Sequence, residues 1–207
     1  MKILDLKTWE RREAYAFFSQ VDYPFYAVTI PVDVTRVKEA SKKRSLSFYH
    51  LMVWLCTKAV NSVEAFRLRV RGENVVLLDR TEPSFTTLSP GERQFRIITL
   101  PWEAEPDVFC AHAGEKARKQ TAFLAQDEEE CDGLIYFSCT PWFDFTALTN
   151  EHNCDRDDTI PRIAWGKYYE QNGGLWLHMS IEVNHRTIDG YHLGLLKEAI
   201  DREIAAL

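Results

Sequence analysis

The sequence is poor in the residues that mark fibrous, disordered or disulfide-stapled proteins. Among 207 residues it has only 9 glycines and 8 prolines, and no tract is rich in glycine and serine. Its five cysteines form an odd set without C-x-x-C spacing, which indicates reduced thiols rather than a disulfide framework or a zinc knuckle. With 45% hydrophobic and 27% charged residues, we expect one globular domain spanning residues 1–207.

A basic stripe, a long apolar run and a glycine-rich phosphate loop are also missing. The formal net charge of −6 disfavours nucleic-acid binding, because that function needs cations to replace the counterions of phosphates. The basic run at residues 42–44 falls at the end of a predicted helix, where cations suit the helix dipole. No stretch approaches transmembrane length, and residues 1–7 lack the apolar segment of a secretory signal, so we expect a cytoplasmic protein without a membrane partner.

Hydrophobic periodicity predicts a mixture of helices and strands, which indicates α/β or α+β layers. We predict helices over residues 35–44, 48–63 after a capping Ser47, and 106 to about 125. We predict strands over residues 25–34, 84–88, 94–100, 134–138 and 163–169, and a hairpin over 67–78. The acidic run at 127–130 and the polar stretch at 150–158 are predicted loops.

The predicted strand at residues 175–185 is the most informative. Its odd positions are apolar and most even ones are polar, so the pattern predicts one buried face with a period of two. His185 continues that face. Asp189 is a plausible N-cap for a helix whose apolar residues run from 193 to 204. The sequence therefore places an imidazole on the core side, between the end of a strand and the start of a helix.

The regular spacing of His178, His185 and His192 suggests a metal site, but geometry argues against one. His178 and His185 are an odd number of residues apart on a strand and so point to opposite faces. His192 lies beyond the turn. We expect no metal site.

Several short motifs then occur in one order along the chain. Residues 185–190 form an H-x-x-x-D-G motif, residues 9–13 match W-x-R-[RK]-E, residues 138–145 match S-x-x-P-W-x-x-F, and residues 166–168 match G/A-K-Y. Residues 48–49 and 82–86 are similar to F-Y-P and D-P-x-F-T. Over nearly its whole length the chain resembles the chloramphenicol acetyltransferase family, within the wider group of CoA-dependent acyltransferases.

This resemblance implies an architecture. The implied fold class is α/β, a two-layer sandwich with a large mixed β-sheet and helices packed on one face. The implied assembly is a homotrimer with interfacial active sites, in which His185 comes from one chain and much of the acceptor pocket from the next. An enzyme of this kind would be inactive as a monomer.

The resemblance also implies roles for two residues in acetyl transfer. Moving an acyl group from a thioester to an alcohol needs a base that titrates near neutrality, and His185 matches the family's base. Its Nε2 is expected to face the acceptor hydroxyl, while a backbone carbonyl holds the other ring nitrogen. Ser138 matches the hydrogen-bond donor that stabilises the tetrahedral oxyanion.

Asp189 matches a structural residue rather than a member of a catalytic dyad. By resemblance it pairs with an arginine near the N-terminus, which here is Arg11. Removing one partner of such a pair strands the other charge, so either change should displace His185.

The remaining site residues are assigned by the same resemblance to ligand binding. Acetyl-CoA enters as a co-substrate, with Tyr168 on its adenine, Lys167 on its phosphates and Trp142 along its pantetheine arm. The acceptor pocket is assigned Phe18, Thr86 and Leu148. Without a glycine-rich loop, CoA would lie in a tunnel rather than on a helix N-terminus.

The chain departs from the family pattern at seven positions near the site, which include Thr187 and Tyr191 in the motif below. Members with antibiotic activity have H-H-x-V-C-D-G-F-H, whereas this chain has Asn184 before His185 and Ile188 in place of the cysteine. Phe18 replaces a common tyrosine, Pro24 replaces a cysteine found in some members, and Ala164 replaces a common threonine. The base is retained, whereas the acceptor is left open.

Taken together, the residues and the resemblance predict an O-acetyltransferase that moves an acetyl group from acetyl-CoA to a hydroxyl acceptor. Chloramphenicol is the leading named acceptor, and antibiotic resistance would then be the associated role. A different alcohol or amine acceptor is one alternative. A non-catalytic trimeric ligand-binding relative is another, but the joint presence of His185, Ser138, Asp189 and Arg11 argues against it.

Overall fold

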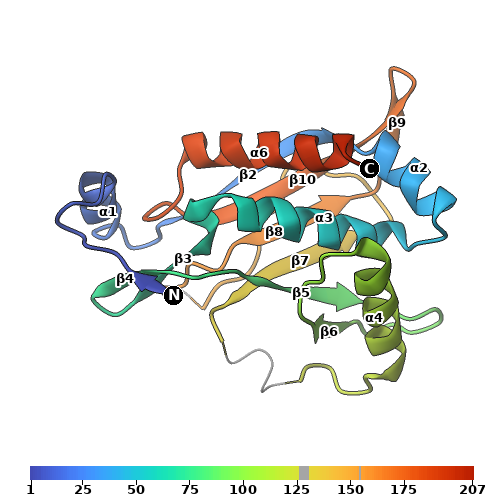
Figure 1. Cartoon of the computed structure of the whole chain (residues 1–207), viewed down its shortest axis with the longest axis horizontal. Coiled ribbons are helices and arrows are strands. Elements are labelled where there is room, and N and C mark those ends of the chain that lie inside the picture. The colour runs from blue at the N-terminus through green and yellow to red at the C-terminus, as the bar shows by residue number, and fades with distance from the viewer. Residues whose placement is uncertain (126–130, 154) are drawn as a thin grey trace.

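The computed structural model describes residues 1–125, 131–153 and 155–207 (Figure 1). The described helices are α1 (Arg12–Phe18), α2 (Thr35–Lys43), α3 (Phe48–Ser62), the 3-10 helix η1 (Glu64–Arg67), α4 (Pro106–Lys119) and α6 (Gly190–Ala205). The described strands are β1 (Lys2–Ile3), β2 (Phe25–Asp33), β3 (Leu68–Arg71), β4 (Asn74–Leu77), β5 (Glu82–Thr87), β6 (Arg96–Thr99), β7 (Leu134–Thr140), β8 (Arg162–Gly166), β9 (Tyr169–Gln171) and β10 (Gly174–Asn184).

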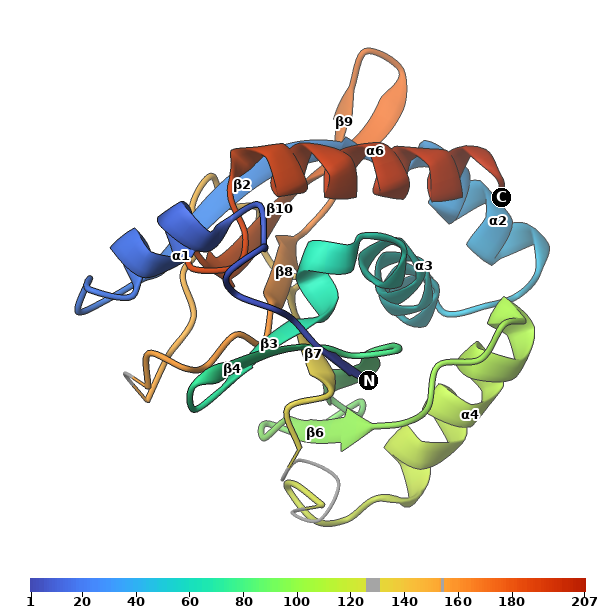
Figure 2. The ribbon, with the colours of Figure 1, turned by 60° about the vertical axis from the view of Figure 1, so that its left-hand side comes forward.

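One large mixed sheet organises the chain. Its strand order is β2-β10-β8-β7-β5-β6, with β9 added beside β10. The β5–β7 and β7–β8 pairs are parallel, and the other pairs are antiparallel. Helices α3 and α6 lie together over one face of this sheet (Figures 1 and 2). The predicted two-layer α/β fold with a large mixed sheet is therefore confirmed.

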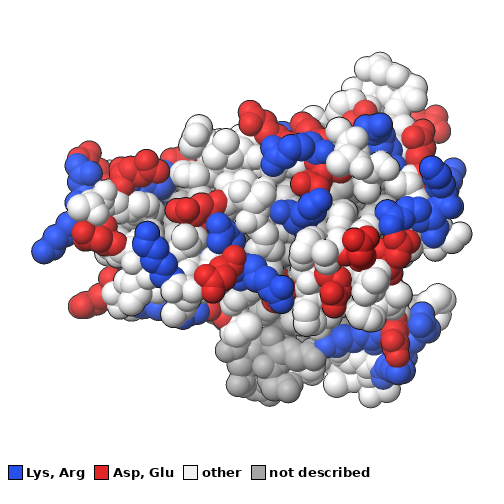
Figure 3. All heavy atoms as spheres, in the orientation of Figure 1, with Lys and Arg blue, Asp and Glu red and all other residues white. Residues whose placement is uncertain are grey.

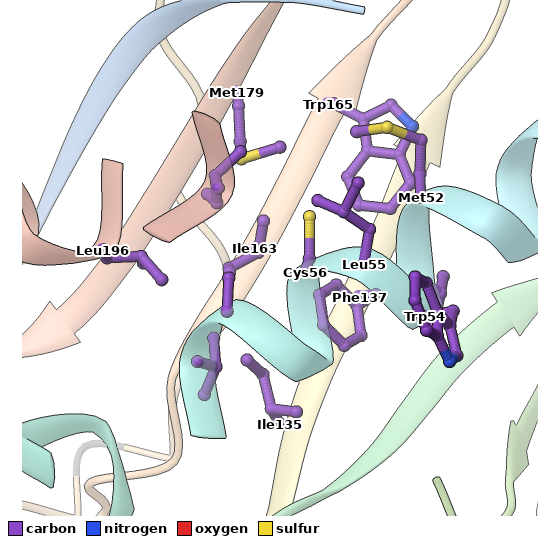
Figure 4. Close-up of a cluster of buried hydrophobic side chains, with 14 of the residues drawn as sticks. Met52, Trp54, Leu55, Cys56, Ile135, Phe137, Ile163, Trp165, Met179 and Leu196 are labelled. Atoms are coloured by element: carbon purple, nitrogen blue, oxygen red, sulfur yellow. The ribbon is translucent and has the colours of Figure 1, made fainter. Parts of the chain in front are cut away.

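The core lies between this sheet face and the two long helices. The odd residues of β10 from Leu177 to Val183 are buried there, as predicted. Figure 4 shows side chains of α3 meeting those of the central strands and of α6, and the labelled members include Met52, Leu55, Cys56, Phe137, Ile163, Trp165, Met179 and Leu196. Burial of this apolar surface is the main force that fixes β10 and α6, and hence the turn between them.

Several local predictions are also confirmed. Helix α3 begins after Ser47, whose hydroxyl oxygen accepts a hydrogen bond from the His50 amide at 3.3 Å. The predicted hairpin forms from β3 and β4, and Gly72 at its turn has a φ of +59°, a conformation that glycine tolerates. Asp189 is the N-cap of α6.

The helix predicted to reach Ala125 instead ends at Lys119. The next residue, Gln120, is extended, and its side chain donates to the Ile97 carbonyl at 2.7 Å. The Ile97 amide in turn donates to the Phe123 carbonyl at 2.8 Å. Tertiary pairing with β6 thus outweighs the local preference for helix.

The single strand predicted over residues 163–169 is divided into β8 and β9. Trp165 pairs with Met179 and Tyr169 pairs with Trp176, so four steps on one side oppose three steps on β10. This extra residue makes a bulge. The bulge separates Lys167 and Tyr168 from both ladders.

The prediction of only one buried face on β10 is wrong for its second half. Ser180, Glu182 and Asn184 are also buried. Residues 148–153 and 155–158 cover that second face, because Ser180 donates to the Leu148 carbonyl at 2.6 Å and Asn184 donates to the Asp158 carbonyl at 2.9 Å. The loop therefore buries polar side chains of β10 that the alternating sequence pattern predicts to be exposed to solvent.

Other predictions concern the loops and termini. Strand β1 pairs with β4 in a small three-stranded sheet that the sequence did not predict. The acidic run at 127–130 and Cys154 lie outside the described residues, while Cys56, Cys110 and Cys139 carry free thiols. Within the described part of the chain, no helix is long and apolar enough to cross a bilayer.

Candidate active site

His185 directly follows β10 and is held from three directions. Its amide donates to the Pro24 carbonyl at 2.7 Å, which ties it to the start of β2. Its ring stacks on Phe18 of α1, with centroids 3.8 Å apart and planes 11° from parallel. The Tyr26 ring lies 4.5 Å from it on another side. The half-buried imidazole thus has a defined plane.

The Nδ1 atom of His185 departs from expectation. It is buried and has no hydrogen-bond partner among the described residues, so the expected backbone carbonyl does not hold it. The carbonyl of His185 itself accepts from Arg11 Nη2 at 3.4 Å, and the ring face of Phe18 offers no hydrogen-bonding atom. Ring stacking, rather than a hydrogen bond, therefore orients the imidazole.

Arg11 and Asp189 form the expected ion pair. Arg11 Nη1 contacts Asp189 Oδ2, and the two side chains are 11% and 32% exposed. The other oxygen of Asp189 accepts from the amides of Tyr191 at 3.0 Å and His192 at 3.4 Å at the start of α6. Because Arg11 also reaches the His185 carbonyl, the pair fixes both ends of the turn at 185–189.

The charges in this turn shift two pKa values. Burial raises the pKa of Asp189, but the hydrogen bond and charge of Arg11 outweigh it, so the pKa lies below its ordinary value. Burial lowers the pKa of His192 below its ordinary value, although the Asp189 charge opposes this shift. At neutral pH the turn therefore holds an ionised carboxylate beside an uncharged imidazole.

Sequence reasoning missed the role of His192. Its Nδ1 lies 2.8 Å from Asp189 Oδ1 and 3.3 Å from the Asp189 amide, which completes a capping box. The signal is present in the sequence, since His192 stands three residues after the predicted N-cap, where a capping-box partner belongs. The sequence pattern had suggested only a metal-ligand role for this histidine.

Arg186 was also missed. Its side chain is 7% exposed, and its guanidinium donates to Ser19, Tyr15 and Asp157 at 2.9, 2.8 and 2.6 Å. It joins α1 to the loop that covers β10. No signal in the sequence reveals this role, because Arg186 occupies a variable position of the H-x-x-x-D-G motif.

Ser138 lies elsewhere, in a cavity of 610 Å³. The cavity is formed by β7, β5, the start of α3 and one side of α4, and Thr86 and Trp142 also line it. Tyr49 lines the cavity too and donates to the Thr86 carbonyl at 2.8 Å. Burial raises the pKa of the neighbouring Cys139 thiol to about 12, so this thiol stays protonated and is a poor nucleophile at neutral pH.

Within one chain, His185 and Ser138 are far apart. Ser138 and Ser180 both pair with Ala164, so they lie level with each other two strands apart. His185 is five residues further along, which places the two Cα atoms on the order of 20 Å apart. In Figure 1, helix α1, which lies beside His185, and helix α4, which lies beside the cavity, are at opposite ends of the molecule.

The other assigned residues do not converge in one chain. Lys167 and Tyr168 lie at the bulge, where the Lys167 amide donates to the Phe143 carbonyl at 2.9 Å. The Tyr168 ring packs on Phe48 with centroids 5.6 Å apart. Leu148 lies over the second face of β10. Of the described residues assigned to CoA, only Trp142 lines the Ser138 cavity.

The fold is shared with a class of solved proteins, the acyltransferases. A solved chloramphenicol acetyltransferase superposes with a TM-score of 0.90 at 24% identity, covering 98% of this chain and 99% of that one. The cubic core of the pyruvate dehydrogenase multienzyme complex superposes with a TM-score of 0.68 at 18% identity, covering 93% and 86%.

Sequence comparison then identifies the family. The sequence model of the chloramphenicol acetyltransferase family matches residues 1–200, so the chain belongs to that family and is an acyltransferase. Chloramphenicol acetyltransferase 3 of Escherichia coli is 24% identical over 192 residues, which are 91% of this chain and 90% of the relative.

Proposed function

We propose that the protein is an O-acetyltransferase that uses acetyl-CoA, with His185 as its general base and chloramphenicol as its leading acceptor. The observation that carries the proposal is the fixed imidazole at the end of β10, stacked on Phe18 and followed by a turn that Arg11 and Asp189 hold. A half-buried histidine in a preset orientation is what general-base catalysis requires.

The reaction follows from these groups. As the acceptor hydroxyl oxygen attacks the thioester carbonyl carbon, Nε2 of His185 takes the hydroxyl proton. The carbonyl oxygen becomes an oxyanion, which accepts a hydrogen bond from the Ser138 hydroxyl. When the tetrahedral intermediate collapses, the carbon–sulfur bond breaks and the CoA thiolate takes the proton from His185. The products are an acetyl ester and CoA.

The distance between base and donor supports an active site built from two copies of the chain. A separation on the order of 20 Å between backbone positions exceeds the reach of both side chains toward one carbonyl group. We therefore propose a homotrimer in which His185 of one chain faces the Ser138 cavity of its neighbour. The related fold in the cubic core of the pyruvate dehydrogenase complex shows that this architecture supports assembly in that relative.

The ligand-binding residues fit the same arrangement. Thr86 belongs to the cavity and Phe18 to the His185 end, so an acceptor between two chains would contact both. Leu148 is assigned to the acceptor by resemblance alone. For CoA we propose Trp142 at the cavity, and Tyr168 and Lys167 at the bulge. The free thiols of Cys56, Cys110 and Cys139 fit a cytoplasmic setting, and chloramphenicol as acceptor would make the biological role antibiotic resistance.

A thiol-release assay tests the function. The protein is mixed with acetyl-CoA and, separately, with chloramphenicol, other alcohols and amines, and free CoA is measured against time. We expect CoA release that depends on an acceptor and a product that carries the acetyl group. Absence of acceptor-dependent release over the whole panel would favour the non-catalytic alternative.

A mixing experiment tests the shared active site. His185→Ala and Ser138→Ala chains are unfolded, mixed in equal amounts and refolded together. If each site takes its base from one chain and its donor from another, random assembly regenerates about a quarter of the sites. If both groups act within one chain, the mixture stays as inactive as its components.

A further inference from the structure

The charged residues around the Ser138 cavity are all of one sign. Among the described residues that line it, the charged side chains are Arg93 and Arg118, and no carboxylate is present. Burial lowers the pKa of His50, a third basic residue of the wall, so this imidazole is uncharged at neutral pH. The chain as a whole has a net charge of −6, so a cavity whose charged described lining residues are all cationic favours an anionic ligand.

The carboxylates nearest in sequence to these two arginines are engaged by other cations. Glu92 binds Arg96 through paired contacts of 2.5 and 2.7 Å. On α4, Glu115 binds Lys119 at 2.5 Å. Neither Arg93 nor Arg118 has an ion pair within the described residues. Neither guanidinium is therefore in direct contact with a described carboxylate, although the Arg118 charge helps to lower the pKa of the nearby Glu115 carboxyl.

The position of Arg118 on α4 strengthens the argument. Basic residues in the last turn of a helix are ordinarily explained by the helix dipole, and Figure 3 shows Lys and Arg atoms gathered over that end of α4. However, Lys116 donates to the Thr99 carbonyl and Lys119 binds Glu115. Arg118 alone of the three lines the cavity.

Gly114 supplies the space that Arg118 uses. A Cβ at this position would lie 3.4 Å from Arg118 Nη1, so the guanidinium lies back along α4 over the glycine, and both residues line the cavity. A glycine inside a helix costs about 1 kcal/mol relative to alanine. In α4 the glycine stands at the position over which the Arg118 guanidinium lies.

The geometry points to an anion-binding subsite, formed by Arg93 and Arg118 at the Ser138 cavity, that takes a phosphate or carboxylate group of a substrate. Guanidinium groups suit both anions, because their planar donors form paired hydrogen bonds with two oxygens. The inference rests on the proposed function in one respect, namely that the cavity receives a substrate of acyl transfer. The anion comes either from the phosphates of CoA or from an acidic group on the acceptor.

Calorimetric binding separates these two sources without relying on activity. CoA, 3′-dephospho-CoA and pantetheine are titrated into the wild type, Arg93→Ala, Arg118→Ala and the double variant. Lys119→Ala is the matched control, because it removes a cation from the next position of the same helix, outside the described lining of the cavity. If the subsite holds CoA phosphates, we expect each arginine variant to weaken CoA binding about threefold or more.

Two further features identify the CoA outcome. The double variant should lose about tenfold, with the loss shrinking at high salt, while pantetheine binding is unchanged. If CoA binding is unaltered in every variant, a second experiment tests whether the subsite binds an acidic group of the acceptor. Two alcohol acceptors that differ by one carboxylate are then compared by KM, and the arginine variants should weaken only the acidic one.

The subsite would be refuted if the arginine variants changed CoA affinity and acceptor KM no more than Lys119→Ala does. An enzyme that binds CoA through these arginines but transfers no acetyl group would refute the proposed function and leave the subsite intact. Charge reversal in Arg118→Glu provides a second variant, and its larger loss of anion affinity would show that charge, rather than local packing, is responsible.

Discussion

The two ends of the large sheet differ in how their polar side chains are engaged and in how open they are to solvent. At the His185 end, polar groups are tied to one another: Asp189 meets Arg11 and caps α6, and Arg186 joins α1 to the loop over β10. At the cavity end, Ser138 instead faces an open space of 610 Å³, which Trp142 also lines. The base is thus fixed by its own chain, whereas the cavity is left accessible.

The difference between the two ends predicts which substitutions lower stability and which lower only turnover or ligand affinity. Changes at the His185 end should reduce both stability and turnover, except for the imidazole itself, which carries an unsatisfied buried nitrogen. Changes at the cavity end should reduce turnover or ligand affinity while leaving stability nearly unaltered. The following variants test this division, beginning with the largest expected effect.

Replacing His185 by alanine should lower turnover by about 10²–10⁴-fold, which is the range for loss of a general base. The melting temperature should change little, because the loss of ring contacts with Phe18 and Tyr26 is offset by removal of a buried Nδ1 atom that has no hydrogen-bond partner within the described chain. Acetyl-CoA turnover and thermal unfolding measure the two effects. His112→Ala, at an exposed position of α4, is the control and should behave as wild type in both. Wild-type turnover in His185→Ala would exclude this residue as the base.

Replacing Ser138 by alanine should lower turnover by about 10²–10³-fold if its hydroxyl stabilises an oxyanion. The residue is only partly buried, so stability should be retained. Cys139→Ala is the neighbouring control, since that thiol is protonated at neutral pH and lines the same cavity. A reduction of less than threefold in Ser138→Ala would point to a different donor.

The fold could be predicted to a large extent because its strongest elements obey local rules. The period of two in β10, the helical spacing in α3 and the cap at Asp189 all survive in the structure. Errors arose where distant segments decided the outcome. Pairing of Phe123 with Ile97 ended α4 early, and the loop over β10 buried Glu182.

The site was predictable in its parts but not in their arrangement. The ion pair of Arg11 with Asp189 followed from the resemblance, and it is present. The orientation of His185 by Phe18 could not be read from spacing, because it depends on how α1 docks beside β10. The cations of the cavity were also missed, since Arg93 and Arg118 are 25 positions apart and line one cavity only in the folded chain.

Replacing Arg11 by alanine should destabilise the protein by about 1–3 kcal/mol. Loss of one partner from a buried pair commonly costs about 3–5 kcal/mol, and the partial exposure of Asp189 reduces that cost. Turnover should also fall, because Arg11 holds the His185 carbonyl. Urea unfolding measures the first effect. Arg12→Ala, which removes an exposed neighbour, should change the unfolding free energy by less than about 0.5 kcal/mol.

The smallest effect is the pH dependence of stability at the same turn. The folded pKa of Asp189 lies below its ordinary value, so ionised Asp189 stabilises the fold fully above about pH 4. That contribution is lost as the pH falls through the folded pKa. Asp189→Asn should therefore be less stable than its parent near neutrality, and the two unfolding curves should converge in acid.

A second substitution isolates this titration from that of its neighbour. The folded pKa of His192 is also lowered, so the contribution of its neutral form declines as the pH falls below about 6.5. Asp189→Asn is therefore made in a His192→Gln background and compared with the His192→Gln parent. This comparison removes the titration of His192 from the pH dependence. A stability difference that persists unchanged down to the most acidic pH would show that the ion pair with Arg11 does not stabilise the turn.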